Sequence, residues 1–279
     1  MNRRFLDCRL RDRRRLLPML VLLGSLVISP AVSPAGAQDM MRHVDLNTPD
    51  MVQAEMTRDD IKTALAGATP AHPLDLSGRM LNGLDLSGLN LSGVNFRAAR
   101  LNKTNLSRAK LVGAMFDQAW MLKADLSGAD MTGAHLFQSQ MISAKLDGAN
   151  LAGARITANL TRASLKNANL AGADLSADMK NQSMGMMRGV LKSADLRGVN
   201  FTGANLSRTN LEFADLRGAK LSGANLMSAE LAGADLRKAT VNGANFNNAD
   251  VDSADLRSLA GKTVANMRKA RNLANAIRE

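Results

Sequence analysis

Residues 214–237 read ADLRGAKLSGANLMSAELAGADLR, and a leucine returns at every fifth position of this stretch. A small residue, usually alanine, stands two positions before each leucine, so the two side chains point to the same side of an extended backbone. The same five-residue word recurs from Leu76 onward. A period of five fits neither an α-helix nor a flat strand, and it indicates a solenoid in which each word forms one side of a coil.

A longer repeat gives the number of words in one coil. The tetrapeptide ADLR recurs every 20 residues, and so does an asparagine in the second half of the chain. The ADLR copies begin at Ala194, Ala214, Ala234 and Ala254, and the asparagines are Asn205, Asn225 and Asn245. Four words therefore make one coil, and residues 20 apart lie above one another. We expect a square tube, filled by leucine and alanine, with backbone pairing between coils.

This pattern of A(D/N)LxG words, over residues 74–258, closely resembles the pentapeptide-repeat family. The resemblance implies a right-handed quadrilateral β-helix, so the expected fold class is an all-β solenoid. Two irregularities interrupt the repeat. Residues 156–160 are one residue short of a word, and residues 176–190 break the period before Leu191 restores it. We interpret the second irregularity as a bulge or a protruding loop.

Short helical caps are expected at both ends, because an open solenoid exposes its core and unpaired strand edges. Within the predicted cap at 38–73, Thr57 and Asp60 have the spacing of a capping box, and Gly67 is the expected helix stop. Residues 259–279 are expected to form a C-terminal helix, which in some members of the resembled family is a dimer contact. Its apolar stripe would consist of Val264, Met267, Ala270, Ala274 and Ile277.

Residues 1–37 are expected to be a signal peptide that is removed. Seven arginines precede the apolar stretch from Leu16 to Ile28, and residues 35–37 match an A-x-A cleavage site. Residues 12–18, DRRRLLP, are also compatible with a twin-arginine signal. The apolar stretch is short for a membrane span. We therefore expect a periplasmic or secreted protein whose mature chain has no integral membrane segment.

Composition narrows the chemistry of the mature chain. Cys8, the only cysteine, lies in the leader, so we expect no disulfide, cysteine metal site or cysteine nucleophile. Removal of the leader lowers the net charge from +11 to about +6. The mature chain is therefore only mildly basic and lacks the high positive charge density of nucleic-acid-binding proteins. No phosphate loop or catalytic constellation is recognisable, and the three histidines are scattered. We expect neither an enzyme nor a cofactor, and no nucleic-acid partner.

Large apolar residues occupy positions that should face solvent. Trp120, the only tryptophan, flanks an inward-facing position and is therefore expected to point outward. The predicted interaction patch spreads over two successive coils and two adjoining sides, and consists of Met115, Trp120, Leu122, Phe137 and Ile142. Exposed patches of this kind are typical of partner sites. Alternatively, a cap segment or residues 176–190 fold over the patch.

Two charged columns run side by side in the second half of the chain. The aspartates are Asp195, Asp215, Asp235 and Asp255, and the arginines are Arg197, Arg217, Arg237 and Arg257. Residues two apart on an extended side are ~7 Å apart, within reach of an arginine side chain. We expect a self-neutralising salt-bridge ladder. The functional alternative is a cationic stripe for an anionic polymer or a membrane surface.

The expected function is that of an exported, non-catalytic scaffold that binds a protein partner through a side or an end of its rod. Some members of the resembled family mimic DNA, bind type II topoisomerases and confer resistance to their inhibitors. The basic charge and the export signal disfavour that role here. A third function, Cu(I) binding, would use the methionines of the second irregularity, which are Met179, Met184, Met186 and Met187. A methionine-rich packing segment explains them more simply and is the favoured interpretation.

Overall fold

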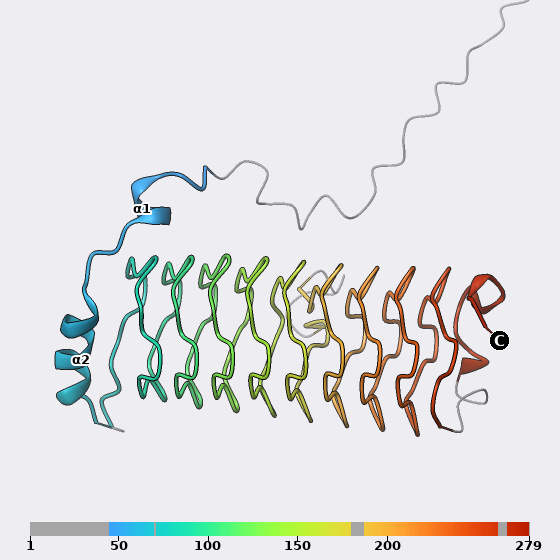
Figure 1. Cartoon of the computed structure of the whole chain (residues 1–279). Helices are drawn as coiled ribbons and strands as arrows, with labels where there is room; N and C mark the ends of the chain where they lie inside the picture. Colours follow the sequence, from blue (N-terminus) through green and yellow to red (C-terminus); the bar gives the residue numbers. More distant parts are fainter. Residues whose placement is uncertain (1–44, 70, 180–186, 262–266, 279) are drawn as a thin grey trace, which may run out of the picture. The chain divides into compact units, whose positions relative to one another are not determined.

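The computed structural model describes residues 45–69, 71–179, 187–261 and 267–278, and the structural findings concern these residues. They form a rod of stacked coils (Figure 1). Parallel β-bridges connect residues 20 apart in the regular part of the rod, beginning with Asp75 and Asn95. The chain is therefore a β-helix whose regular coil contains 20 residues and four sides, as the recurrence of ADLR predicts.

Each word of the repeat forms one side and one corner of a coil. In residues 105–109, Asn105 forms bridges to the coils on both sides, and Leu106 is fully buried. The next two residues turn the corner, where Arg108 has a φ of +56°. Ala109 then points inward again. Because the chain turns after every bridge residue, the bridges are isolated and no long strand develops.

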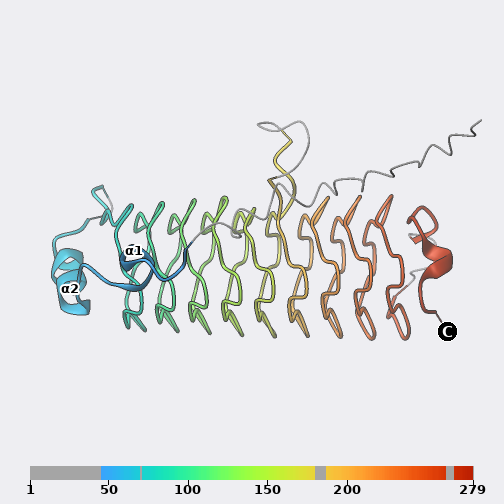
Figure 2. The ribbon, with the colours of Figure 1, turned by 90° about the horizontal axis from the view of Figure 1, so that it is seen from above.

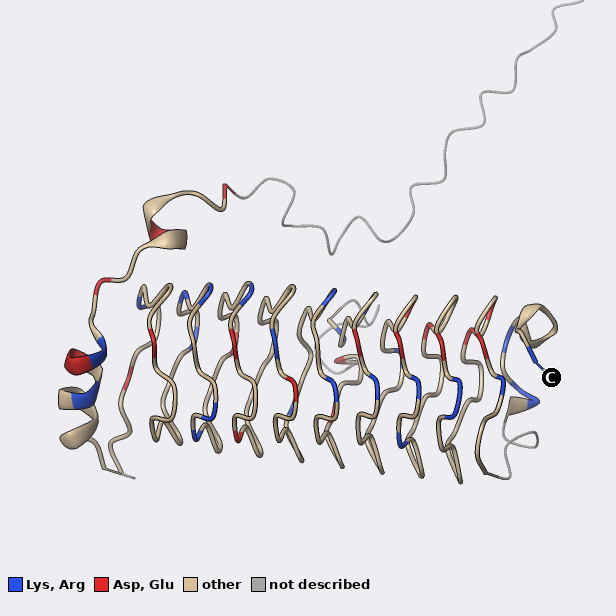
Figure 3. Ribbon diagram, viewed as in Figure 1, with Lys and Arg blue, Asp and Glu red and all other residues tan. Residues whose placement is uncertain are grey.

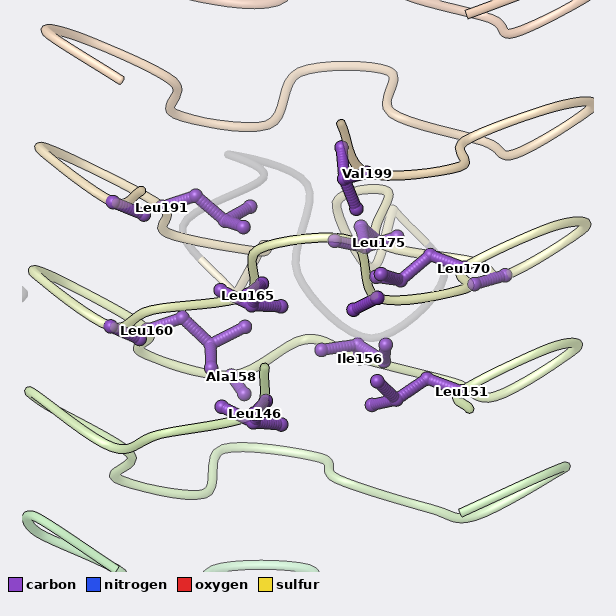
Figure 4. Packing of buried hydrophobic residues seen from close by; sticks show 14 of the residues in the cluster. Leu146, Leu151, Ile156, Ala158, Leu160, Leu165, Leu170, Leu175, Leu191 and Val199 are labelled. Atoms are coloured by element: carbon purple, nitrogen blue, oxygen red, sulfur yellow. The ribbon is translucent and has the colours of Figure 1, made fainter. Parts of the chain in front are cut away.

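The core is a continuous column of apolar side chains inside the tube. Leu126, Leu146 and Leu216 are all fully buried, as the period of five predicts. Figure 4 shows how leucines of successive coils form layers in the middle of the rod. Nearer the N-terminal end, the rings of Phe96 and Phe116 stack with centroids 5.0 Å apart. Burial of this column supplies most of the stabilisation, at roughly 0.8 kcal/mol per methylene group.

The bridge register changes where the repeat breaks in the sequence. Gln140 pairs with Asn159, only 19 residues ahead, because the word that begins at Ile156 is one residue short. Asn159 in turn pairs with Val190, which is 31 residues ahead and so adds eleven residues to the regular 20. The added residues form an insertion, whose described part leaves the coil at Asp178 and projects from the rod (Figure 2).

Two helices precede the first coil, α1 (Pro49–Val52) and α2 (Arg58–Ala66). A reciprocal capping box between Thr57 and Asp60 starts α2. Ile61 is fully buried in the apolar column, and Arg58 donates hydrogen bonds to two backbone carbonyls of the first coil, at 2.5 and 2.9 Å. Helix α2 therefore covers apolar side chains at the start of the tube (Figure 1).

The C-terminal segment does not form the predicted continuous helix over 259–279. Within 267–278, Arg271 and Ile277 pair with the preceding coil, and only a short 3-10 helix, η3 (Leu273–Asn275), lies between them. Residues 262–266 lie outside the described part of the chain, and with them Val264 of the predicted stripe.

Pairing with the edge of the last regular coil explains why the predicted continuous helix does not form. The Ile277 N–H donates to the Ala254 carbonyl at 2.8 Å, so the segment satisfies backbone groups that the last regular coil would leave unpaired. Met267 is buried and Ala270 packs on the core, whereas Ala274 is exposed and Ile277 is 48% exposed. The apolar stripe is therefore split. Within the described residues, no helix has the length and apolar character needed to cross a membrane.

Candidate interaction surface

Trp120 lies on one side of the rod, which we call the Trp120 side. The bridge residues of this side begin with Met80, Arg100, Trp120, Gln140 and Asn159 and continue through Val190, Asn210, Glu230 and Asp250 to Arg271. The backbone of Trp120 pairs with the preceding coil, since its N–H donates to the Ala99 carbonyl at 2.9 Å. Its side chain is partly exposed, whereas the adjacent Met121 is fully buried. Trp120 thus faces outward and does not belong to the core.

The structure brings four of the five predicted patch residues onto the Trp120 side and its two corners. Ile142 lies one coil beyond Leu122, because the N–H of the residue after Leu122 donates to the Ile142 carbonyl at 3.0 Å. Phe137 stands at the opposite corner of the same side. Met115 is a bridge residue of the adjoining side, paired with His135. All five side chains of the patch are partly exposed.

The segment around helix α1 packs on the Trp120 side, over the coils that precede the patch. The Asn82 amide donates to the carbonyls of Asp50 and Gln53, at 3.0 and 2.7 Å. The Asn102 amide donates to the Met51 carbonyl at 3.2 Å, and the Met51 side chain is buried. In Figure 2, α1 lies across these first coils. The segment therefore borders the patch, but the patch residues keep exposed surface.

Charge contributes to this docking. The Arg100 guanidinium lies 3.0 Å from the Asp50 carboxylate. A hydrogen bond from the Thr48 hydroxyl and the nearby charge of Arg100 lower the pKa of Asp50. On the same segment, Glu55 accepts a hydrogen bond from the Met80 N–H at 3.1 Å. The carboxylates of this segment are thus matched to donors of the rod.

The insertion meets the opposite corner of the Trp120 side. The Gln138 amide, next to Phe137, lies 3.0 Å from the sulfur of Met187. Asp178 closes the base of the insertion by donating its N–H to the Met187 carbonyl at 2.8 Å. Arg188 then binds Glu230 through two hydrogen bonds of 2.7 and 2.8 Å. The base of the insertion is therefore fixed to the rod beside the patch.

The structure bears on the methionine hypothesis only in part. Met179 is 46% exposed and Met187 is partly buried, while Met184 and Met186 lie outside the described residues. Among the described residues, no group of three or more histidine, aspartate or glutamate side chains is placed to hold a metal ion.

The aspartate and arginine columns form interlocked pairs on the next side of the rod. Arg197 donates to both carboxylate oxygens of Asp195, at 2.8 and 2.7 Å, and its Nε lies 3.6 Å from Asp215 in the following coil. The same double contact links Arg237 to Asp235 and Asp255. Figure 3 shows these columns as adjacent blue and red segments. Arg197, Arg217 and Arg237 therefore each bridge two carboxylates, and Arg257 pairs with Asp255.

Hydrogen bonds within the ladder shift the acidities of both partners. Hydrogen bonds from the paired arginines lower the pKa values of Asp195, Asp235 and Asp255, and the same contacts raise the pKa values of Arg197 and Arg237. The carboxylates of the ladder therefore neutralise the positive charge of its own arginines.

The asparagine column is hydrogen-bonded along the rod. The Asn225 amide donates to the Asn205 side-chain oxygen at 3.3 Å, and Asn245 repeats the contact to Asn225 at 3.2 Å. A second ladder joins Asn150, Asn169 and Asn200, which the sequence reasoning missed because the short word and the insertion change their spacing to 19 and 31 residues. These ladders are structural features of the rod.

Sequence reasoning also missed a row of cations beside the patch. The cation row consists of Lys103, Lys123 and Arg162. All three occupy the same corner position, directly after the Trp120 side, and all three are exposed. None forms an ion pair with another described residue within 4.0 Å. Their spacing of 20 and then 39 residues equals one coil and then two, and the shortened word hides this from a search at 20.

Comparison with protein families identifies the repeat. The family described as pentapeptide repeats matches in eight copies over residues 75–108, 90–121, 121–157, 158–177, 190–223 and 224–258. The chain belongs to the pentapeptide-repeat family. Membership implies the right-handed sense of the four-sided β-helix, and the unmatched residues 178–189 coincide with the insertion.

Solved structures of other pentapeptide-repeat proteins are similar to the chain. HetL, involved in heterocyst differentiation regulation in the cyanobacterium Nostoc sp. strain PCC 7120, is 26% identical, with 80% of this chain and 95% of HetL covered and a TM-score of 0.38. QnrB1, a plasmid-mediated fluoroquinolone resistance protein, is 15% identical, with 74% and 92% covered and a TM-score of 0.36. A protein of the Arabidopsis thaliana thylakoid lumen is 27% identical, with 48% and 68% covered and a TM-score of 0.23. A comparison with curated proteins finds no match.

Proposed function

We propose that this pentapeptide-repeat protein is an exported, non-catalytic scaffold that binds a protein partner through the Trp120 side. The observation that carries the proposal is the partly exposed cluster of Trp120, Leu122, Phe137 and Ile142 on one side of a rod whose interior is filled. A few residues carry most of the binding energy at protein interfaces, and tryptophan is enriched among them. A filled tube leaves its outer sides and ends for recognition.

The structure favours the Trp120 side over the other surfaces suggested by the sequence. The arginine column is matched by aspartates, so it offers little free charge to an anionic polymer. The same pairing opposes a DNA mimic, which needs an excess of negative charge along the rod. A dimer through a C-terminal helix has no support within 267–278, because that segment pairs with the last coil instead.

The test is recovery of partners from cell-envelope extract with the immobilised protein. The double substitution Trp120→Ser/Leu122→Ser removes apolar surface from the patch. The control Val112→Ser/Met227→Ser removes apolar surface elsewhere on the rod, where these side chains are 42% and 40% exposed. We expect the first variant to lose a partner that the wild type and the control retain. Equal recovery of every partner by all three proteins would contradict the proposal.

A further inference from the structure

The first coils of the Trp120 side already hold a polypeptide segment of defined chemistry, which belongs to the chain itself. Residues 48–55 place the buried Met51 against the rod and the Asp50 carboxylate on Arg100. A second carboxylate, that of Glu55, lies 3.6 Å from Arg79. This side of the rod therefore binds an acidic segment through one apolar side chain and paired charges.

The mode of recognition changes at Leu122. In the preceding coils, the corner position holds Asn82 and Asn102, whose amides bind carbonyls of the docked segment. Leu122 and Ile142 continue the same column but carry no polar group. Beyond the docked segment, the Trp120 side consequently offers apolar contact in place of amide hydrogen bonds.

Free positive charge accompanies this apolar surface. Lys123 directly follows Leu122 in the chain, and Lys103 and Arg162 occupy the same corner on either side of the patch. Farther along the same corner, Lys192 stands in the column of Leu122 and Ile142 and is paired with Glu212 at 2.7 Å. The cation row has no such partner among the described residues.

The exposure of the patch distinguishes a polypeptide from a bilayer. An apolar face that inserts into a membrane is buried to a depth of about 5–10 Å, whereas the side chains of Trp120, Leu122 and Ile142 are only partly exposed. Coils are ~4.8 Å apart, so Lys103 and Lys123 lie about 5 Å apart and Arg162 lies about 10 Å beyond Lys123, with Ser143 between them. These intervals are near those of carboxylates one turn and two turns apart on one face of a helix. Flat apolar surface with a cationic rim suits an acidic segment that carries apolar side chains.

We propose that the partner docks an acidic, amphipathic polypeptide segment on the Trp120 side, with its apolar face on Trp120, Leu122 and Ile142 and its carboxylates on Lys103, Lys123 and Arg162. This inference rests on the proposed function and adds the chemistry of the partner. The docked residues 48–55 are the intramolecular counterpart of the partner segment on the same side of the rod.

Trp120 supplies the measurement, because it is the only tryptophan and the chain has no tyrosine. The probe is a synthetic helical peptide of about four turns, with leucine on one face and glutamate on the other. We expect saturable binding with a blue shift of the tryptophan emission, and weaker binding at higher salt because the charges are screened. A peptide with lysine in place of glutamate and vesicles of phosphatidylglycerol are the comparison probes.

Charge reversal of the cation row gives the matched comparison. Lys103→Glu/Lys123→Glu/Arg162→Glu keeps Trp120 and should weaken the glutamate peptide by about tenfold or more. The control reverses three exposed cations on other parts of the rod, namely Lys110, Lys220 and Lys238. That control should bind as the wild type does.

Several results would overturn the assignment. They are an unchanged emission with the glutamate peptide, an equal shift with the lysine peptide, and equal weakening by both triple substitutions. A shift produced by vesicles alone would assign the surface to an anionic membrane instead. If the wild type sedimented as a dimer and the cation-row variant as a monomer, the Trp120 side would be assigned to contact with a second copy of the chain. The pull-down separates this inference from the proposed function. A partner that is lost with Trp120→Ser/Leu122→Ser but still recovered with the charge-reversed variant would support the scaffold and reject the acidic segment.

Discussion

The backbone N–H of Leu122 donates a hydrogen bond to the side-chain oxygen of Asn102, one coil earlier, at 3.0 Å. The amide nitrogen of the same Asn102 donates to Met51 in the docked N-terminal segment. One buried side chain thus joins the docked segment, its own coil and the first residue of the apolar column. The position of the patch on the rod and the docking of the N-terminal segment share this connection.

Substitution of Asn102 should therefore loosen the docked segment. Asn102→Ala leaves the Leu122 N–H and the Met51 carbonyl without these partners, which typically costs about 1–3 kcal/mol. Hydrogen exchange should accelerate at residues 50–55 and stay unchanged in the distant coils. Asn247→Ala removes an amide at an equivalent position of another corner and should have little effect, because Asn247 bonds to other described residues only through its backbone N–H and carbonyl. Similar exchange in both variants would show that Asn102 does not hold the segment.

Paired leucine substitutions separate the filled interior from the outer surface. Leu126→Ala opens a cavity in the column and should lower the free energy of unfolding by about 2–5 kcal/mol, because the side chain is fully buried. Leu122→Ala, four residues earlier, removes a partly exposed side chain and should cost less than about 1 kcal/mol. Urea denaturation followed by circular dichroism measures both. Equal losses would mean that Leu122 is as deeply packed as Leu126.

The period of five was enough to place the core, because the side-chain direction follows directly from position within a word. Leu126 and Leu146 are buried and Trp120 faces outward for the same reason, namely their place relative to the bridge residue. Position within a word also brings Leu122 and Ile142 together, since one coil separates them. Local backbone geometry repeated along the chain therefore carries most of the fold.

The parts that the period could not supply depend on contacts between segments outside the repeat. The docking of Met51 on the rod depends on the side-chain amides of Asn82 and Asn102. In the sequence, nothing distinguishes these two asparagines from other corner residues. The C-terminal segment has the apolar spacing of a helix, but unpaired edge groups of the last coil bind Arg271 and Ile277 instead. Tertiary pairing here outweighs intrinsic helix preference.

Acid should weaken the ladder in a predictable direction. The folded-state pKa values of Asp195, Asp235 and Asp255 lie below the unfolded value of about 3.9. Their contribution is therefore present above about pH 4 and is lost as the pH falls through the folded values. The arginines stay charged throughout this range. The melting temperature should fall more steeply below pH 4 than between pH 5 and 7.

Removing one arginine should flatten this acid dependence. Arg237→Gln deprives Asp235 and Asp255 of a shared cation and should lower stability only slightly at neutral pH. The loss of melting temperature between pH 7 and 3 should then be smaller than in the wild type. Lys238→Gln removes the neighbouring exposed cation and should leave the slope unchanged. A slope that is the same in all three proteins would show that other carboxylates dominate.

The predicted signal peptide is testable by mass spectrometry of protein recovered from the periplasm or medium. Cleavage after Ala37 should give an N-terminus at Gln38, as the A-x-A pattern predicts. Replacing Arg13 and Arg14 by lysine should block export only if the twin-arginine pathway is used. Recovery of the unaltered protein at full length from the cytoplasm would contradict the predicted signal peptide.

Gly189 brings the chain back into the tube after the insertion, and its size is the reason it fits. A β-carbon at this position would lie 2.9 Å from the Leu175 carbonyl oxygen and 3.2 Å from the Ile156 carbonyl oxygen. Gly189→Ala should therefore force the backbone apart, at a cost of about 1–3 kcal/mol.

Gly113 is the comparison, because a β-carbon there meets nothing within 4 Å although its φ is +63°. Gly113→Ala should cost only about 1 kcal/mol for the left-handed conformation, which Lys103 already adopts with a φ of +58°. Urea midpoints of the two variants give the difference, and a Gly113→Ala loss equal to or larger than that of Gly189→Ala would show that backbone conformation, not the close approach to Leu175, limits this position.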